Sequence, residues 1–268
     1  MTVTRVDASG AAVALACPPR RIVSLLPSTT ETLCALGLAD ALVGVTTYCV
    51  EPRAALRGKA RVGGTKNPDL DRIRALAPDL VVANVEENVR EHVERLRAWG
   101  VPVWVTYPRT VADSLRMIRE LGELTGTEAS AGALLAELEP LLERVRADGA
   151  ARPAVAVFYP IWRAPYMTIG GDTYIHDLLA VCGGRNVFGD RSERYFRITL
   201  DEVAVRRPEV VLLPDEPFRF RAAHVKDFAG LGARRIQLVD GRLFSWYGPR
   251  LGAALRTVPA LLGAGTGR

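Results

Sequence analysis

Residues 70–82 have the sequence LDRIRALAPDLVV, and residues 200–212 have the sequence LDEVAVRRPEVVL. Both begin with Leu and Asp, carry an apolar fourth residue, and place Pro and an acid directly before an apolar run. The offset between them is 200 − 70 = 130 residues. Solenoid repeats recur at roughly 20 to 50 residues. We therefore predict two equivalent lobes rather than a solenoid.

The acid in each copy, Asp71 or Asp201, falls in the first turn of a predicted helix. A carboxylate is favoured there by the helix dipole, and the later Pro ends the helix before the strand. Two compatible interpretations remain open. The acids either serve their own helices, or they are also exposed at matching places on two lobes and bind a symmetric basic partner.

Apolar runs alternate with helical stretches through residues 21–108, which is typical of βα units on a largely parallel sheet. We expect the helix after the first strand to have Ser28 or Thr29 as its N-cap and Gly37 as its C-cap. The predicted strands of this region are RIVSLL (21–26), ALVGVTT (41–47), LVVAN (80–84) and PVWVTY (102–107).

A long helical segment follows, because Leu, Met and Ala recur at helical spacing from Thr110 to Ala147 with interruptions near Gly126 and Pro140. Later strands are predicted at AVAVFYP (154–160), EVVLLP (209–214) and RIQLVD (235–240). We therefore predict an α/β fold with two Rossmann-like lobes joined by a long, rigid backbone helix. The predicted divisions are an N-terminal lobe with an N-terminal strand segment (1–108), the backbone helix (109–150) and a C-terminal lobe (151–268).

Composition narrows the class of protein. The formal net charge is +5, but no run of five basic residues occurs, so nucleic-acid binding is not predicted. No apolar stretch approaches the roughly 20 residues of a spanning helix. Residues 1–17 contain one Arg and Asp7 and fit a secretory signal poorly, with a lipidated Cys17 as the alternative. No export signal is predicted, which leaves a cytoplasmic location open.

Metal and catalytic motifs are also missing from the sequence. The four cysteines form no C-x-x-C pair, so unpaired thiols are expected. The three histidines, His92, His176 and His224, form no H-x-H or H-x-x-x-H pair, so no protein-bound metal ion is predicted. His176 is the candidate for ligating a bound chelate. No nucleotide-binding or hydrolase motif occurs, so no catalytic residue is predicted.

Four segments carry a family resemblance: RIVSLLPSTTETLCALG, VGVTTYCVEP, VGGTKNPDLDRIRALAPDLVVA and LLAVCGGRNVF. In this order they resemble the periplasmic cobalamin- and iron-siderophore-binding proteins, the helical-backbone receptors of ABC transporters. The resemblance implies a ligand cleft between the lobes, delivery to a permease dimer, a monomer without a cofactor, and a periplasmic or cell-surface location. It also implies that Asp71 and Asp201 dock on permease arginines.

The resemblance also implies ligand contacts. Tyr48 and Tyr195 match aromatic residues that flank the corrin, whereas two expected tryptophans are replaced by Thr65 and Asn84. Aromatic faces in loops after strands suit a flat macrocycle or a catecholate, with packing inside the lobe as the alternative. The predicted ligand-binding set is Ser28, Tyr48, Thr65, Asn84, Trp162, Arg163, Tyr166, Tyr195, Arg197, Trp246 and Tyr247, and further arginines considered for anionic groups are Arg219, Arg221 and Arg250.

We therefore predict a substrate-binding protein of an ABC transporter. Its ligand is expected to be cobalamin or a related iron or metal chelate, such as a siderophore or haem, and no catalysis is expected. The alternative is an intracellular protein or enzyme on the same fold that handles tetrapyrroles or metal chelates, because fold alone does not fix function.

Overall fold

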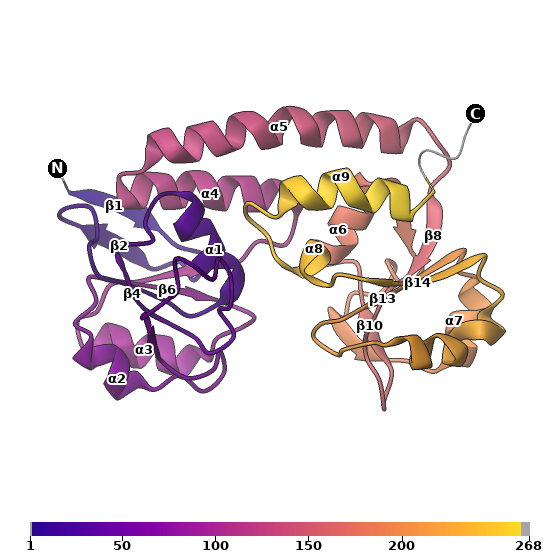
Figure 1. The fold of residues 1–268 in the computed structure, drawn as a ribbon, viewed down its shortest axis with the longest axis horizontal. Coiled ribbons are helices and arrows are strands. Elements are labelled where there is room, and N and C mark those ends of the chain that lie inside the picture. The colour runs from indigo at the N-terminus through magenta and orange to yellow at the C-terminus, as the bar shows by residue number, and fades with distance from the viewer. Residues whose placement is uncertain (1, 264–268) are drawn as a thin grey trace. The chain divides into compact units, whose positions relative to one another are not determined.

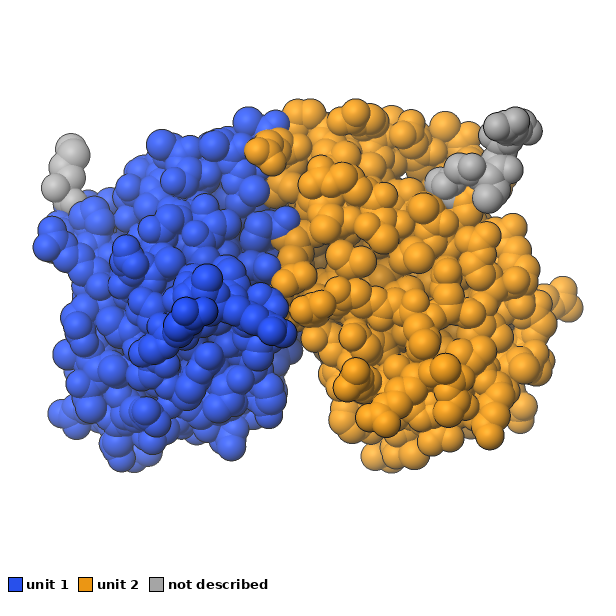
Figure 2. Space-filling model, in the orientation of Figure 1, with its two compact units in different colours: residues 1–108, 112–136, 247–249 blue, residues 109–111, 137–246, 250–268 orange. Residues whose placement is uncertain are grey.

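The computed structural model describes residues 2–263 and divides the chain into two compact units. The first unit comprises residues 1–108, 112–136 and 247–249, and the second comprises residues 109–111, 137–246 and 250–268 (Figure 2). The segment predicted as a backbone helix at 109–150 is therefore shared between the two units.

The first unit contains a two-stranded hairpin and a five-stranded parallel sheet with the order β5-β4-β3-β6-β7 (Figure 1). Its strands are β1 (Val3–Val6), β2 (Ala12–Leu15), β3 (Ile22–Ser24), β4 (Leu42–Val45), β5 (Ala60–Arg61), β6 (Leu80–Asn84) and β7 (Val103–Thr106). Every residue of β6 and β7 is buried, as expected for continuous apolar strands of a parallel sheet that is covered on both faces.

Three short helices accompany this sheet: α1 (Pro27–Ala35), α2 (Leu70–Ala75) and α3 (Arg90–Ala98). The predicted N-cap of α1 is wrong. Leu26 occupies that position without a side-chain cap, and Ser28 and Thr29 lie inside the helix. The physical reason is Pro27, whose fixed φ suits the first helical position. Gly37 has φ +83° and follows the C-cap residue Leu36.

The predicted backbone helix consists of two helices, α4 (Val111–Thr125) and α5 (Glu128–Ala150). Gly126 separates them in the left-handed conformation, with φ +70°, which ends a helix readily because glycine has no Cβ. Pro140 does not interrupt α5. The interruption that the sequence predicts near Gly126 is therefore confirmed, and the one predicted near Pro140 is wrong.

The second unit contains a four-stranded parallel sheet, β11-β8-β13-β14, and a three-stranded antiparallel sheet, β12-β10-β9. Their bounds are β8 (Val155–Phe158), β9 (Pro160–Trp162), β10 (Met167–Ile169), β11 (Gly184–Asn186), β12 (Tyr195–Arg197), β13 (Val210–Pro214) and β14 (Arg235–Val239). The antiparallel sheet was not predicted from the sequence because its strands have only three residues each.

The helices of the second unit are α6 (Tyr174–Val181), α7 (Leu200–Arg206), the 3₁₀ helix η1 (Ala222–Leu231), α8 (Arg242–Ser245) and α9 (Leu251–Leu261). Each unit has its own apolar core. In the first, Ile73 of α2 and Leu96 of α3 pack with strand residues such as Val81. In the second, Val203 of α7 packs with an aromatic group that includes Phe158 and Phe228. In residues 2–263, no helix is both long and apolar enough to cross a membrane.

Candidate functional site

The two copies of the sequence repeat form the same capped helix. The Asp69 side chain accepts a hydrogen bond from the backbone N–H of Arg72 at 2.9 Å. At the equivalent position, the Thr199 hydroxyl accepts the N–H of Glu202 at 3.2 Å, and the Glu202 carboxylate accepts the N–H of Thr199 at 2.7 Å. These bonds satisfy N–H groups that the first turn of a helix leaves unpaired.

The likeness extends to backbone conformation and burial. Ala77 has φ +44° and Arg207 has φ +49°, although neither is a glycine. Residues 70–80 and 200–210 also show the same order of buried, half-buried and exposed positions. The 130-residue repeat is therefore a repeat of structure as well as of sequence.

The two acids of the repeat are exposed in the first turns of their helices, Asp71 in α2 and Asp201 in α7. One turn later the helices differ, since α7 presents Val205 with 80% of its surface exposed and α2 presents Ala75. Both acids are thus accessible to a partner, and the apolar neighbour is larger on α7.

A second pair of acids, Asp79 and Glu209, accepts hydrogen bonds from backbone N–H groups at or just before neighbouring strands. The Asp79 carboxylate accepts the backbone N–H groups of Arg20 and Arg21 at 2.7 and 2.9 Å, just before β3 begins. In the second unit, the Glu209 carboxylate accepts the N–H of Ala156 in β8 at 3.0 Å. Each carboxylate therefore links the residue before one strand to the backbone of the adjacent strand.

The first unit exposes one aromatic side chain from the predicted ligand set. Tyr48 follows β4 and has 61% of its surface exposed, and the apolar residues Val50 and Val85 are also exposed after β4 and β6. Thr65 is half-buried, and its carbonyl oxygen accepts the Asn88 side-chain amide at 2.9 Å. Within the predicted ligand set, Tyr48 is therefore the exposed aromatic side chain of this unit.

Asn84, at the end of β6, is the centre of a buried hydrogen-bond network. Its Nδ2 donates to the Thr106 carbonyl oxygen at 2.9 Å and to the Tyr247 hydroxyl at 2.8 Å. Its Oδ1 accepts the backbone N–H groups of Glu86 and Glu87 at 2.9 and 3.1 Å. The side chain that replaces an expected tryptophan thus holds the loop after β6.

The Tyr247 side chain belongs to the same network. Its hydroxyl is also hydrogen-bonded to Ser28, and burial raises its pKa well above the usual tyrosine range. Ser28 is 4% exposed and Tyr247 is 6% exposed. In this conformation both residues contact protein, and a direct contact of either with a ligand stays a prediction.

The antiparallel sheet of the second unit brings three predicted residues onto one exposed face. Met167 of β10 pairs with Trp162 of β9 and with Arg197 of β12. Tyr195 lies two residues from Arg197 and therefore shares its face. Trp162 and Tyr195 are 42% and 45% exposed, respectively. This face combines two aromatic rings with a guanidinium group.

Arg163 and Tyr166 are held by an acid that sequence analysis did not find. Asp227 in η1 accepts a hydrogen bond from Arg163 Nε at 2.9 Å and another from the Tyr166 hydroxyl at 3.1 Å. The pKa of Asp227 is lowered, chiefly by the bond from Arg163. The turn between β9 and β10 is thereby tied to η1. No motif marks Asp227, so only the fold reveals this role.

Trp162 directly precedes Arg163 in the chain, and its ring packs edge-on against Phe218 with ring centroids 5.7 Å apart. Tyr166 packs in the same manner on Phe228, at 5.5 Å. Arg163 and Tyr166 are therefore bonded to protein around an exposed tryptophan, and their contact with a ligand stays a prediction.

Trp246 is 8% exposed, in contrast to Trp162. The Arg250 guanidinium lies over its ring at 4.9 Å from the centroid. The Glu216 carboxylate bonds to the Trp246 side chain and accepts the Ser245 hydroxyl at 2.9 Å. These contacts favour the packing interpretation of Trp246.

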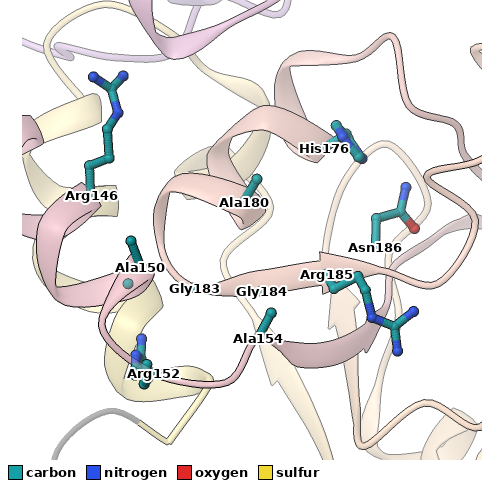
Figure 3. Close-up of a pocket in the computed structure, with 11 residues that line it drawn as sticks. Arg146, Ala150, Arg152, Ala154, His176, Ala180, Gly183, Gly184, Arg185 and Asn186 are labelled. Atoms are coloured by element: carbon teal, nitrogen blue, oxygen red, sulfur yellow. The ribbon is translucent and has the colours of Figure 1, made fainter.

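A pocket of about 450 Å³ lies within the second unit and includes His176 (Figure 3). Burial lowers the pKa of His176, which favours its neutral form. Arg146 and Arg185 also line this pocket, but their side chains extend away from one another. Between residues 2 and 263, no three His, Cys, Asp or Glu side chains are grouped to hold a metal ion. The four cysteines are free thiols.

A family model described as periplasmic binding protein matches residues 22–228, which is more than half of the chain. The chain belongs to this family. The match spans elements of both units, from β3 to η1. It confirms the family and the α/β fold that the sequence resemblance implied.

Individual relatives have different ligands in their names. A vitamin B12-binding protein of Vibrio campbellii is 29% identical over 194 residues, which cover 72% of this chain and 70% of the relative. A periplasmic heme-binding protein from Pseudomonas aeruginosa superposes with a TM-score of 0.79 at 26% identity, covering 91% of this chain and 92% of that one. A structure described as an ABC-type Fe3+-hydroxamate transport system, from Saccharomonospora viridis, has a TM-score of 0.76 at 26% identity and covers 98% and 99%. The relatives are binding and transport proteins, in agreement with the prediction of a protein without catalysis.

Proposed function

We propose that this protein is the substrate-binding protein of an ABC transporter and that it binds a metal chelate of the tetrapyrrole or siderophore class. We also propose that it acts as a monomer, in the periplasm or at the cell surface, and passes the chelate to a permease dimer. The named ligands of its relatives, vitamin B12, heme and Fe3+-hydroxamate, support this class of ligand.

The observation that carries the proposal is the exposure of aromatic rings at the ends of strands. Tyr48 in the first unit and Trp162 and Tyr195 in the second are each more than two-fifths exposed. Large aromatic side chains are usually well buried in proteins, and rings at the surface supply flat, apolar area for a planar ligand. We propose that these three residues are the principal ligand contacts.

The test is a titration of the protein with cyanocobalamin, haemin and ferrichrome, followed by absorbance and calorimetry. At least one should bind. Replacing Trp162 with Ala should then weaken binding by about 1–3 kcal/mol, because a stacked ring and its apolar area are lost. Tyr48→Ala and Tyr195→Ala should each have an effect of the same order.

Trp99 provides the matched control. Its ring is packed between the guanidinium groups of Arg74 and Arg95 on the helical side of the first unit, at 5.0 and 5.8 Å. Trp99→Ala should leave chelate affinity unchanged in protein that circular dichroism shows to be folded. Failure of the wild type to bind any of the three chelates would overturn the proposed function.

We further propose that Asp71 and Asp201 dock on basic residues of the permease. Their support is the repeated geometry, since both acids are exposed in the first turn of a capped helix at equivalent places in two units. A permease dimer would present two equivalent basic surfaces, which two equivalent acids can match.

The docking proposal predicts that Asp71→Arg combined with Asp201→Arg abolishes association with the cognate permease and leaves chelate affinity intact. Glu91 and Glu128 are exposed acids in the first turns of α3 and α5. Reversing both of them changes the net charge by the same amount and should leave association nearly unchanged. Equal loss in the two double variants would show an effect of net charge and would contradict specific docking.

A further inference from the structure

A pocket of about 480 Å³ lies at the carboxyl ends of β13 and β14 in the second unit. In open parallel α/β sheets, ligands bind outside the carboxyl ends of the strands. Its lining includes the charged residues Asp215, Arg219, Arg221, Asp240 and Arg242 and the apolar residue Leu238.

The two acids of the pocket already have partners. Asp240 forms two hydrogen bonds with the Arg242 guanidinium, both at 2.9 Å. The Asp215 side chain accepts the backbone N–H of Gly241 at 2.8 Å. The charge of Asp240 is therefore matched by Arg242, whereas Asp215 is bonded to a neutral N–H group and keeps its negative charge.

The unmatched positive charges are those of Arg219 and Arg221. Both side chains are exposed, whereas Phe220 between them is 3% exposed and lies in the apolar core. Because Phe220 is turned inward, its two neighbours are both directed outward, and both line the pocket. In the described part of the chain, no carboxylate lies within ion-pair distance of either guanidinium. A bound anion would compensate the positive charges of these two guanidinium groups.

The pocket also has an apolar wall and a link to the exposed tryptophan. Leu238 is 45% exposed and forms the wall together with Val239. The Phe220 ring packs on Phe218 at 4.9 Å, and Phe218 packs on Trp162 at 5.7 Å. The two arginines are therefore separated from the proposed stacking surface by a short series of aromatic rings within one unit.

We infer that Arg219 and Arg221 form a subsite for acidic substituents of the bound chelate, so that the substrate class is an anionic metal chelate with carboxylates at its periphery. This inference rests on the proposed function. Guanidinium groups bind carboxylates through two parallel, charge-assisted hydrogen bonds. The apolar wall accepts the hydrocarbon that joins each carboxylate to the body of the chelate. Arg163 differs from these two arginines, because its Nε already donates to Asp227.

The experiment compares haemin with haemin dimethyl ester, which keeps the macrocycle and the iron but lacks the carboxylates. The wild type should bind haemin at least about tenfold more tightly than the ester, as expected for the loss of charge-assisted bonds. Arg219→Ala with Arg221→Ala should weaken haemin binding about tenfold or more and leave binding of the ester unchanged. Retention of the full preference by the double variant would overturn the subsite.

A control and a second probe separate this inference from the proposed function. Arg144→Ala with Arg207→Ala removes the same charge from exposed positions of the same unit and should preserve the preference for haemin. Metal-free citrate is titrated by calorimetry whether or not haemin binds. Citrate binding that disappears in the Arg219/Arg221 double variant supports the subsite even when the chelate proposal fails. If neither citrate nor haemin carboxylates are recognised by the wild type, the subsite is wrong even when another chelate binds.

Discussion

The segment from α2 to β6 and the segment from α7 to β13 are alike up to the last residue of each strand and then diverge. Both have a side-chain cap, an exposed acid, a left-handed residue and a carboxylate bonded to the neighbouring backbone. However, β6 ends at Asn84, which organises a buried polar network, whereas β13 ends at Pro214 and leads to the pocket with Arg219 and Arg221. The repeated parts support the sheets, and the parts that follow them carry the differences in chemistry.

Substitutions at these strand ends should show the largest difference between the segments in the free energy of unfolding. Asn84→Ala removes the partner of two partly buried loop N–H groups and of the buried Tyr247 hydroxyl, so it should lower the free energy of unfolding by about 2–3 kcal/mol. Pro214→Ala removes apolar ring atoms, adds one backbone N–H and should cost about 1 kcal/mol. Urea denaturation followed by circular dichroism measures both. Equal losses of unfolding free energy in the two variants would contradict a stabilising polar network that is present only at the end of the first segment's strand.

Removal of the helix caps, in contrast, should have a similar effect on the stability of the two segments. Asp69→Ala and Thr199→Ala each remove one side-chain acceptor from the first turn, and each should cost about 1 kcal/mol of unfolding free energy. Thr199 also takes part in a reciprocal pair with Glu202, so its loss is expected to be the larger of the two. A loss in one segment and none in the other would break the equivalence.

The smallest effect is a gain in stability at the left-handed positions. Ala77→Gly and Arg207→Gly relieve the contact between Cβ and the backbone, and each should raise the free energy of unfolding by about 0.5 kcal/mol. Inside the preceding helices, Ala75→Gly and Val205→Gly should have the opposite effect, a loss of about 0.5–1 kcal/mol. Thermal unfolding of the four variants tests the sign of the effect. A loss at residue 77 or 207 would contradict the strain argument.

Much of this fold could be predicted because long apolar runs and capping residues are local signals. The helix-ending Pro78 and Pro208 lie within the repeat, and the strands β6 and β13 begin within it. The start of α1 was misassigned because a hydroxyl side chain resembles a cap even where Pro27 sets the first turn. The sequence indicated an interruption near Gly126. That this interruption divides α4 from α5 is seen from the left-handed φ of Gly126 in the structure.

The candidate site was harder to predict because sequence does not separate a surface aromatic residue from a buried one. Trp162 and Trp246 are equally plausible in the sequence, yet one is 42% exposed and the other 8%. Arg163 carried the expected charge, but its carboxylate partner, Asp227, is 64 residues away in the chain. Only tertiary packing decides which charges are already matched and which remain available.

The carboxylates of Asp79 and Glu209 help to fix the register of neighbouring parallel strands, which apolar side chains alone do not determine. The first four residues of β6 and all of β13 are apolar and buried, so sliding either strand by two residues would keep mostly equivalent side chains in the core. Such a slip would carry each carboxylate about 6–7 Å along the sheet and away from the N–H groups it accepts. One acidic side chain per sheet therefore selects a single alignment of two strands.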